Sequence, residues 1–400
     1  MLRPALGVAR SARGWLLPVA AVAVLLTGTL PAGDARAVVV RIWPVMAFLL
    51  AVTVVAELAD AAGLFEAAAG IAARAGRGRV PVLWLLVVVL ATITTTLLSL
   101  DTTAVLLTPV VLALAQRLGL PPLPFALATA WLANTGSLLL PVSNLTNLLA
   151  VERTGWSANT WAGRMWAPAL VAVLVTVAVL WLLTRRHLRG RYALEPAGPA
   201  DHRGLLTLAG VACLGLGIAV GAGVPPWVAA GVAALVLVAA FVRAEPARLT
   251  RELLPGRLVL NTVAVFLLVA AAERHGLAGL LHRAAGTPTG TGLLDLLRTA
   301  GVGTLAANGL NNLPAYLALE PAVAPAAVPG AGGAAHLLAL VIGVNAGPLV
   351  TPWGSLATLL WLERCRARGV DVPPWRLAGY GVLLVVPVVV AATAALYLTG

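Results

Sequence analysis

Polar residues interrupt four otherwise apolar stretches of this sequence, and these interruptions hold the residues that could do chemistry. Asp101 is the only acid between Glu66 and Glu152, and it lies in a Ser-Leu-Asp-Thr-Thr run. The other residues of interest are neutral hydrogen-bonding residues and glycines: Ser99, Thr102, Asn134, Thr135, Gly136, Ser143, Asn144, Asn311, Asn312, Asn345, Gly347, Thr351, Gly354 and Ser355. We predict that this set forms one substrate-binding site and that Asp101 is its coupling residue.

These residue types suit binding at membrane depth. Glycine permits unwound backbone, while Asn, Ser and Thr satisfy the freed backbone groups and present donors and acceptors to a ligand. A carboxylate inside a membrane costs about 2.5–3.5 kcal/mol on insertion scales, which makes Asp101 a functional candidate that could bind and release a proton. The alternatives are structural: interhelical contacts for the neutral residues, and backbone hydrogen bonds within the hairpin for Asp101.

The composition is that of a membrane protein. Of 400 residues, 60% are hydrophobic and 10% are charged, and the mean hydropathy is +0.96, whereas a soluble domain has about 25% charged residues. The apolar runs are long and not alternating, which favours helices over a barrel. The net charge of +12 comes from arginines in short loops, without a single lysine. Such loops orient membrane spans, so we expect no nucleic-acid partner.

Enzyme and metal signatures are absent from the sequence. It has no HExxH, GxSxG or P-loop pattern, and no second acid lies near Asp101 in the sequence. Cys213 and Cys365 are isolated, which argues against a disulfide framework or a thiolate metal site. We therefore expect no catalytic residues, no metal and no cofactor, with a membrane-embedded enzyme as the outside alternative.

Apolar segments long enough to cross about 30 Å of hydrocarbon can be read directly. They are residues 15–30, 42–56, 165–184, 204–223, 224–242, 258–272 and 377–399. Residues 80–116 and 290–328 are too long for one span and are interrupted, which predicts re-entrant helical hairpins. Residues 122–151 and 336–363 are one span long but have breakers in the middle, which predicts discontinuous helices lining a cavity.

The two sets of irregular segments form an internal repeat. The pattern Asn-x-Gly-x-Leu-x-x-Pro-x-x-x-Leu begins at Asn134 and again at Asn345, and Arg41 precedes Glu57 by the interval that separates Arg257 from Glu273. We predict an all-α polytopic membrane protein with a first inverted repeat at 1–190, a basic cytoplasmic linker at 191–203 and a second inverted repeat at 204–400.

Arginine-rich loops fall on one side under a topology of nine full spans, which gives a cytoplasmic N-terminus and an extracytoplasmic C-terminus in the cell membrane. Residues 1–37 also resemble a cleavable signal peptide, although the repeat favours retaining 15–30 as a span. Glu57 and Glu273 are expected near span ends, Glu320 at a hairpin end, and the five histidines in loops or interfaces.

Several of these segments resemble the arsenical pump membrane protein (arsenite/antimonite permease) family of the ion transporter superfamily. The resemblance is carried by SLDTTAVLLTP at 99–109, ANTGSLLLPVSNLTN at 133–147, NNLPA at 311–315 and IGVNAGPLVTPWGSLATLLW at 342–361. It covers the chain from about residue 15 to the C-terminus. Leu100 departs from the family pattern, which usually has Asn there.

The resemblance implies arsenite or antimonite efflux by proton exchange, sometimes with a soluble ATPase partner. It also implies that the two hairpin tips and the two helix breaks form the site. Amides and hydroxyls suit neutral arsenous acid better than a dianion, and no three-thiol cluster exists to capture arsenic. The alternative within transport is a proton- or sodium-coupled transporter of a small carboxylate or other oxyanion, and a homodimer remains open.

Overall fold

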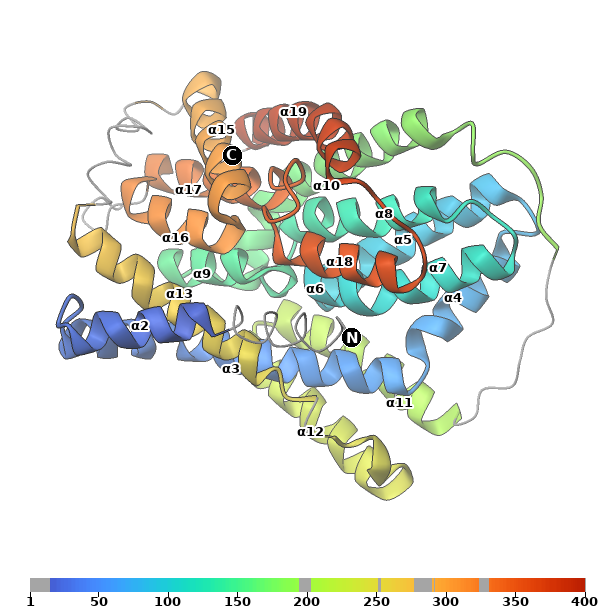
Figure 1. The fold of residues 1–400 in the computed structure, drawn as a ribbon, viewed down its shortest axis with the longest axis horizontal. Helices are drawn as coiled ribbons and strands as arrows, with labels where there is room; N and C mark the ends of the chain where they lie inside the picture. The colour runs from blue at the N-terminus through green and yellow to red at the C-terminus, as the bar shows by residue number, and fades with distance from the viewer. Residues whose placement is uncertain are drawn as a thin grey trace, which may run out of the picture.

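The computed structural model describes residues 15–193, 203–250, 253–276, 290, 292–323 and 331–399, whose regular elements are almost entirely helices (Figure 1). Within these ranges, eight helical segments are long and apolar enough to cross a membrane. Many large apolar side chains on the longest helices are exposed, as expected for helices that face lipid. The predicted all-α polytopic architecture is confirmed.

The helices of the two halves follow one order. The first half has α2 (Leu16–Leu26), α3 (Ala32–Ala61), α4 (Leu64–Ala75), α5 (Val80–Leu97), α6 (Leu100–Thr102), a π-helical turn (Thr103–Leu107), α7 (Thr108–Arg117), α8 (Pro122–Thr135), α9 (Leu145–Thr154) and α10 (Ala158–Thr184). The second half has α11 (Arg203–Gly221), α12 (Pro226–Ala244), α13 (Gly256–Arg274), α15 (Leu293–Leu310), α16 (Asn312–Val323), α17 (Ala331–Ala346), α18 (Leu356–Ala367) and α19 (Pro374–Thr399).

Both predicted hairpins are present. The first reverses between α5 and α6 at Ser99, and the second reverses between α15 and α16 at Asn311. Asn311 has a φ of 121°, a region that residues other than glycine rarely adopt, and its side-chain amide donates to the Trp353 carbonyl at 2.9 Å. That bond to the second helix break holds the tip in its unusual conformation.

Both predicted discontinuous helices are present as well. α8 ends at Thr135, and the chain passes through two 3₁₀ turns, Gly136–Leu138 and Pro141–Ser143, before α9 begins. α17 ends at Ala346 and α18 begins ten residues later. Proline lacks a backbone N–H and glycine lacks a side chain, so these breaks fall where the sequence cannot support a continuous helix.

The two broken helices contact each other at the centre of the protein. The Asn345 side-chain amide donates to Asn147 Oδ1 at 2.7 Å, and the Thr146 hydroxyl donates to Asn345 Oδ1 at 2.6 Å. All three residues are fully buried. The start of α9 in the first half is therefore bonded directly to the end of α17 in the second.

Loop contacts define two ends of the molecule. At the basic end, the Val80 amide donates to the Gly190 carbonyl at 3.3 Å, and the Gln116 side chain donates to the Arg368 carbonyl at 2.8 Å. At the opposite end, Arg274 pairs with Asp34 at 2.6 Å. In Figure 1 the α4–α5 turn lies on the right and the end of α13 on the left. The first hairpin has its base at the basic end and the second at the opposite end, so the repeats are inverted.

The N-terminal helices differ from the expected spans. α2 has 11 residues, which reach about 16 Å at 1.5 Å per residue, less than the hydrocarbon thickness. It ends where the Thr27 hydroxyl bonds the Ala23 carbonyl and Gly28 takes a φ of 70°. α3 begins ten residues before the predicted 42–56 span, because Asp34 and Arg41 have partners at the opposite end.

Candidate functional site

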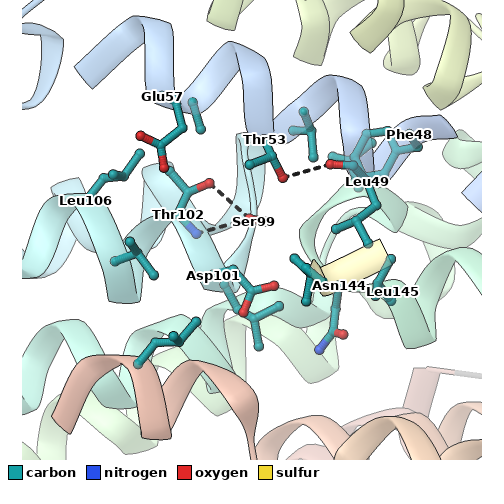
Figure 2. Close-up of a pocket in the computed structure, with 17 residues that line it drawn as sticks. Phe48, Leu49, Thr53, Glu57, Ser99, Asp101, Thr102, Leu106, Asn144 and Leu145 are labelled. Carbon is teal, nitrogen blue, oxygen red and sulfur yellow. Dashed lines mark hydrogen bonds between the residues drawn. The ribbon is translucent and has the colours of Figure 1, made fainter. Parts of the chain in front are cut away.

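A cavity of about 110 Å³ lies between α3 and the tip of the first hairpin, and we call it the hairpin-tip pocket (Figure 2). Its wall also includes the start of α9, Leu258 of α13 and Leu360 of α18. Four of the predicted site residues line it: Ser99, Asp101, Thr102 and Asn144. The pocket thus joins the first hairpin tip to the first helix break.

The hairpin tip presents Asp101 to this pocket. Ser99 caps the short helix α6, because its hydroxyl accepts the Thr102 amide at 3.1 Å and lies 3.0 Å from the Thr102 hydroxyl. Within the described part of the chain, the Asp101 carboxylate has neither a hydrogen-bond nor an ion-pair partner. The structural alternative, in which Asp101 accepts hydrogen bonds from the hairpin backbone, is therefore not what the structure shows.

α3 supplies the wall that faces the tip. Figure 2 shows Thr53 and Glu57 descending from α3 above Ser99 and Asp101. The Thr53 hydroxyl donates to the Leu49 carbonyl at 2.7 Å, and Glu57 is half-buried. The expectation that Glu57 lies at a span end understated its position, since it lines the same pocket as Asp101. The signal was present in the repeat, where Glu57 and Glu273 occupy matching positions.

The charge of the lining is distinctive. Of the described residues around the pocket, Asp101 and Glu57 are the two ionisable ones, and none is Arg or His. The other polar groups are the hydroxyls of Thr53, Ser99 and Thr102 and the carboxamide of Asn144. Such a site offers neutral donors and acceptors next to acids. It suits a neutral polyhydroxylated solute or a cation far better than an anion.

The other predicted residues of the first break hold its backbone together. The Ser143 hydroxyl donates to the Thr96 carbonyl at 2.9 Å, and the Thr96 hydroxyl donates to the Gly136 carbonyl at 3.3 Å. Thr135 accepts from Thr176 at 3.0 Å, and the Asn134 amide donates to its own helix at the Ala130 carbonyl. In this structure these side chains position the break rather than line the pocket.

The second break is held by Asn308, a residue that the sequence analysis missed. Its amide donates to the Gly347 carbonyl at 2.8 Å, and its Oδ1 accepts the backbone amides of Val350 and Thr351 at 3.1 and 3.0 Å. The Thr351 hydroxyl returns a bond to the Asn308 carbonyl at 2.8 Å. The repeat could have revealed this role, because Asn308 precedes its hairpin tip by the same three residues as Thr96.

The remaining predicted residues lie around the second tip and the centre. The backbone N–H of Asn312 donates to the Gly354 carbonyl at 2.9 Å. Asn345 belongs to the contact between the two broken helices, which we call the central junction. Five buried side-chain oxygens have no hydrogen-bond partner in the described structure, and three of them belong to the two broken helices: Asn134 Oδ1, Ser355 Oγ and Thr358 Oγ1. A buried polar atom without a partner is costly, so these are positions where a ligand or a water molecule would be stabilised.

Substitution of Asn308 by alanine is expected to loosen the second break. Two backbone amides and one carbonyl lose their partner, and a buried unsatisfied group costs about 1–3 kcal/mol. We expect a lower unfolding temperature of the purified protein and slower transport. Thr96→Ala is the matched comparison, because it removes one long bond of 3.3 Å to the other break. Equal effects of the two substitutions would contradict this role for Asn308.

Two further acid and histidine positions have tertiary partners that the sequence did not indicate. Glu320 lies near the end of the second hairpin as expected, and its side chain is 2% exposed, with both carboxylate oxygens bonded by Arg41 Nη2 at 2.8 and 3.0 Å. His336 was expected in a loop or interface, yet it is buried, bonded to the Thr299 hydroxyl at 2.8 Å and to the Gly290 carbonyl at 2.7 Å. The partners of Glu320 and His336 are distant in sequence, so no local sequence pattern predicted these contacts.

Comparisons with known proteins agree with this architecture. The family model described as "Arsenical pump membrane protein" matches residues 8–399. The arsenical pump membrane protein of Escherichia coli K12 is 29% identical over 401 aligned residues, which cover 96% of this chain and 93% of that protein. A 46 kDa membrane protein of Mycobacterium leprae is 27% identical, covering 89% and 86% of the two chains.

A solved structure shares the fold. The YdaH transporter of Alcanivorax borkumensis, whose crystal structure is described as having an unusual topology, superposes with a TM-score of 0.62. The match covers 92% of this chain and 89% of that one at 16% sequence identity.

Proposed function

The chain belongs to the arsenical pump membrane protein family, and from that membership we propose that it exports arsenite and antimonite in exchange for protons. A membrane transporter of this family needs a route for the solute and a group that couples its movement to an ion. We place both at the hairpin-tip pocket and assign no catalytic role to any residue.

The lining of the pocket is the observation that carries the proposal. Arsenous acid at neutral pH is largely an uncharged trihydroxide, and its hydroxyls can both donate and accept hydrogen bonds. Eleven of the 17 described lining residues are apolar, and the other six supply three hydroxyls, one carboxamide and two carboxylates, with no arginine or histidine among them. An anionic substrate would meet repulsion from Asp101 and Glu57, and none of the described lining residues is a cation that could contact it.

Asp101 is the proposed coupling group. Its carboxylate lies at the hairpin tip without a protein partner in the described structure, so proton binding breaks no existing contact. In the proposed cycle, a proton bound at Asp101 travels inward and the neutral solute travels outward. The second hairpin has Leu313 at the matching second position of α16, so its tip has no equivalent carboxylate.

The orientation follows from charge. The basic end carries the arginine-rich loops 74–79, 185–191 and 364–368, which favours a cytoplasmic location for that end. The proposed topology therefore keeps the N-terminus cytoplasmic and the end of α19 extracytoplasmic.

Uptake of arsenite into everted membrane vesicles tests the substrate and the driving force together. Under an imposed inside-acid pH gradient, vesicles that contain the protein should accumulate arsenite, and a protonophore should release it. Vesicles without the protein are the control. Accumulation that ignores the gradient would contradict proton exchange. No accumulation by well-expressed protein would reject arsenite and direct the search to small carboxylates and other oxyanions.

A further inference from the structure

A second, smaller cavity of about 80 Å³ lies at the opposite end of the protein, and we call it the Glu320 pocket. Its lining comes from α3, α13 and the second hairpin: Val38, Arg41, Ile42, Phe266, Val269, Ala270, Glu273, Leu317, Glu320 and Pro321. None of these residues belongs to the predicted substrate site.

Four lining positions of the two pockets correspond in the two inverted halves. Each residue of α3 corresponds in the repeat to the residue of α13 that lies 216 positions later in the sequence. Arg41 and Arg257 are separated by this interval. Thr53 and Glu57 line the hairpin-tip pocket, and their counterparts Val269 and Glu273 line the Glu320 pocket. Each pocket also receives one residue from the long helix of the other half. Leu258 of α13 lines the first pocket, and its counterpart Ile42 of α3 lines the second.

The hairpins obey the same relation. Their second arms correspond at an interval of 212 residues, which relates Pro109 to Pro321 and the capping position Ser99 to Asn311. Val105 lines the hairpin-tip pocket, and its counterpart Leu317 lines the Glu320 pocket. Each pocket is thus built where one long helix crosses the hairpin of its own half, and the inversion places the two at opposite ends.

The pockets differ in which part of the hairpin lines them, since the first is lined by the tip residues Ser99, Asp101 and Thr102 and the second by Leu317, Glu320 and Pro321. The second pocket also contains an ion pair. Arg41 of α3 holds Glu320 of α16 with two bonds, and Arg153 of α9 adds a contact at 3.8 Å to the same carboxylate. Arg41 also lies 3.8 Å from Glu152 of α9. These contacts tie the long helix to the second hairpin across the wall of the Glu320 pocket.

The matching position in the first half cannot form this pair. The counterpart of Glu320 is Thr108, an uncharged residue whose hydroxyl lies within hydrogen-bond distance of the Thr103 carbonyl at 3.1 Å and of the Thr129 hydroxyl at 2.9 Å. The counterpart of Arg41 is Arg257, whose guanidinium lies over the Trp15 ring at 5.6 Å. The Arg41–Glu320 pair therefore has no equivalent at the corresponding positions beside the hairpin-tip pocket.

We propose that the Glu320 pocket is the second mouth of the transport pathway, where the solute leaves, and that the Arg41–Glu320 ion pair holds this mouth closed while the hairpin-tip pocket is accessible. Inverted repeats exchange conformations during alternating access, so a pocket in one half has a counterpart that opens when it closes. The inference rests on transport through these pockets and does not require arsenite as the solute.

Cysteine accessibility tests the proposal without any substrate. Val269→Cys is the reporter for the Glu320 pocket and Thr53→Cys is the reporter for the hairpin-tip pocket, each in a full-length chain with the buried Cys213 and Cys365 replaced by alanine. A membrane-impermeant methanethiosulfonate is applied to intact cells and to everted vesicles, and the labelling rate is measured. With the ion pair intact, the Thr53→Cys reporter should react from the basic end, and the Val269→Cys reporter should react slowly from the other.

Glu320→Gln is the decisive variant. Loss of one partner of a buried ion pair is strongly unfavourable to the state that contains it. Labelling of the Val269→Cys reporter should therefore rise by about tenfold or more, while labelling of the Thr53→Cys reporter falls. Arg274→Gln is the matched control, because it breaks the exposed Arg274–Asp34 pair between α13 and α3 at the same end. It should leave both rates unchanged.

Two results would overturn the proposal. Labelling of the Glu320-pocket reporter that is equal with and without Glu320→Gln would show that the ion pair closes nothing. A rise at both reporters together would show general loosening and not alternate opening.

A second variant keeps the test decisive if Glu320→Gln fails to reach the membrane. Arg41→Lys retains the charge but has a shorter side chain and no second nitrogen to face Glu152, which lies 3.8 Å from Arg41 Nε, so it should raise labelling of the Glu320-pocket reporter to a smaller extent. Arsenite uptake by the unmodified protein is independent of either result, which separates this inference from the choice of solute.

Discussion

Asp101→Asn is expected to abolish gradient-driven accumulation of arsenite in everted vesicles while leaving the protein folded. A single proton that moves across about 100 mV supplies about 2.3 kcal/mol, which supports an about fiftyfold gradient of a neutral solute. Asparagine has nearly the same shape as aspartate but cannot exchange a proton at neutral pH. Accumulation should therefore fall to the level of vesicles without the protein.

The structure explains why this substitution should spare the fold. In the described residues the Asp101 carboxylate has no partner, so its replacement leaves no buried group unsatisfied. Glu66→Gln is the control, because that carboxylate is exposed on α4. Counterflow of arsenite across membranes without a pH gradient separates coupling from binding. Gradient-driven accumulation that survives in Asp101→Asn would show that the proton is carried elsewhere, with Glu57 as the next residue to test.

Asn345→Ala is expected to destabilise the protein strongly. It removes the contact between the two broken helices and leaves Thr146 Oγ1 and Asn147 Oδ1 without their bonds in a fully buried place. At about 1–3 kcal/mol for each unsatisfied group, the loss is about 2–4 kcal/mol, reduced because the Asn147 amide keeps its bonds to the Ser137 and Leu140 carbonyls.

The measurement is the unfolding temperature of the purified protein in detergent, which should fall by several degrees, together with transport in vesicles. Asn159→Ala is the control, because Asn159 is exposed in the first turn of α10. An unchanged unfolding temperature in Asn345→Ala would mean that apolar packing alone joins the two halves.

The sequence predicted the hairpins and the helix breaks because both follow from local chemistry. Gly136, Pro141, Gly347 and Pro352 fall inside apolar runs together with Asn, Ser and Thr, a combination that disfavours a continuous helix, whereas Pro44 and Pro168 alone do not interrupt theirs. Inverted repeats followed from the order of these signals and from the number of spans between them. The boundaries of α2 and α3 were less accurate, since Asp34 and Arg41 find partners in helices far along the chain.

The assignment of individual polar residues was harder, because it depends on how helices cross. Ser99, Asp101, Thr102 and Asn144 line the pocket, whereas Ser143, directly before Asn144, bonds the backbone of the first hairpin. A shift of one position along the break therefore separates a residue that lines the pocket from one that bonds the backbone. Glu57 and Glu320 look like span-end acids in sequence, and only tertiary packing shows that one lines the pocket of Asp101 and the other faces Arg41.

The central junction also has a consequence for the symmetry of the chain. Asn345 pairs with Thr146 and Asn147, and the residues at the reciprocal positions are Asn134, Ala357 and Thr358. That second contact is not made in the described structure, since Asn134 Oδ1 and Thr358 Oγ1 are buried without partners. The two halves are therefore no longer interchangeable parts. In a chain built from two copies of the second half, Asn345 would face Ala357 where it now faces Thr146. In a chain built from two copies of the first half, Asn134 would face Asn147 at both contacts.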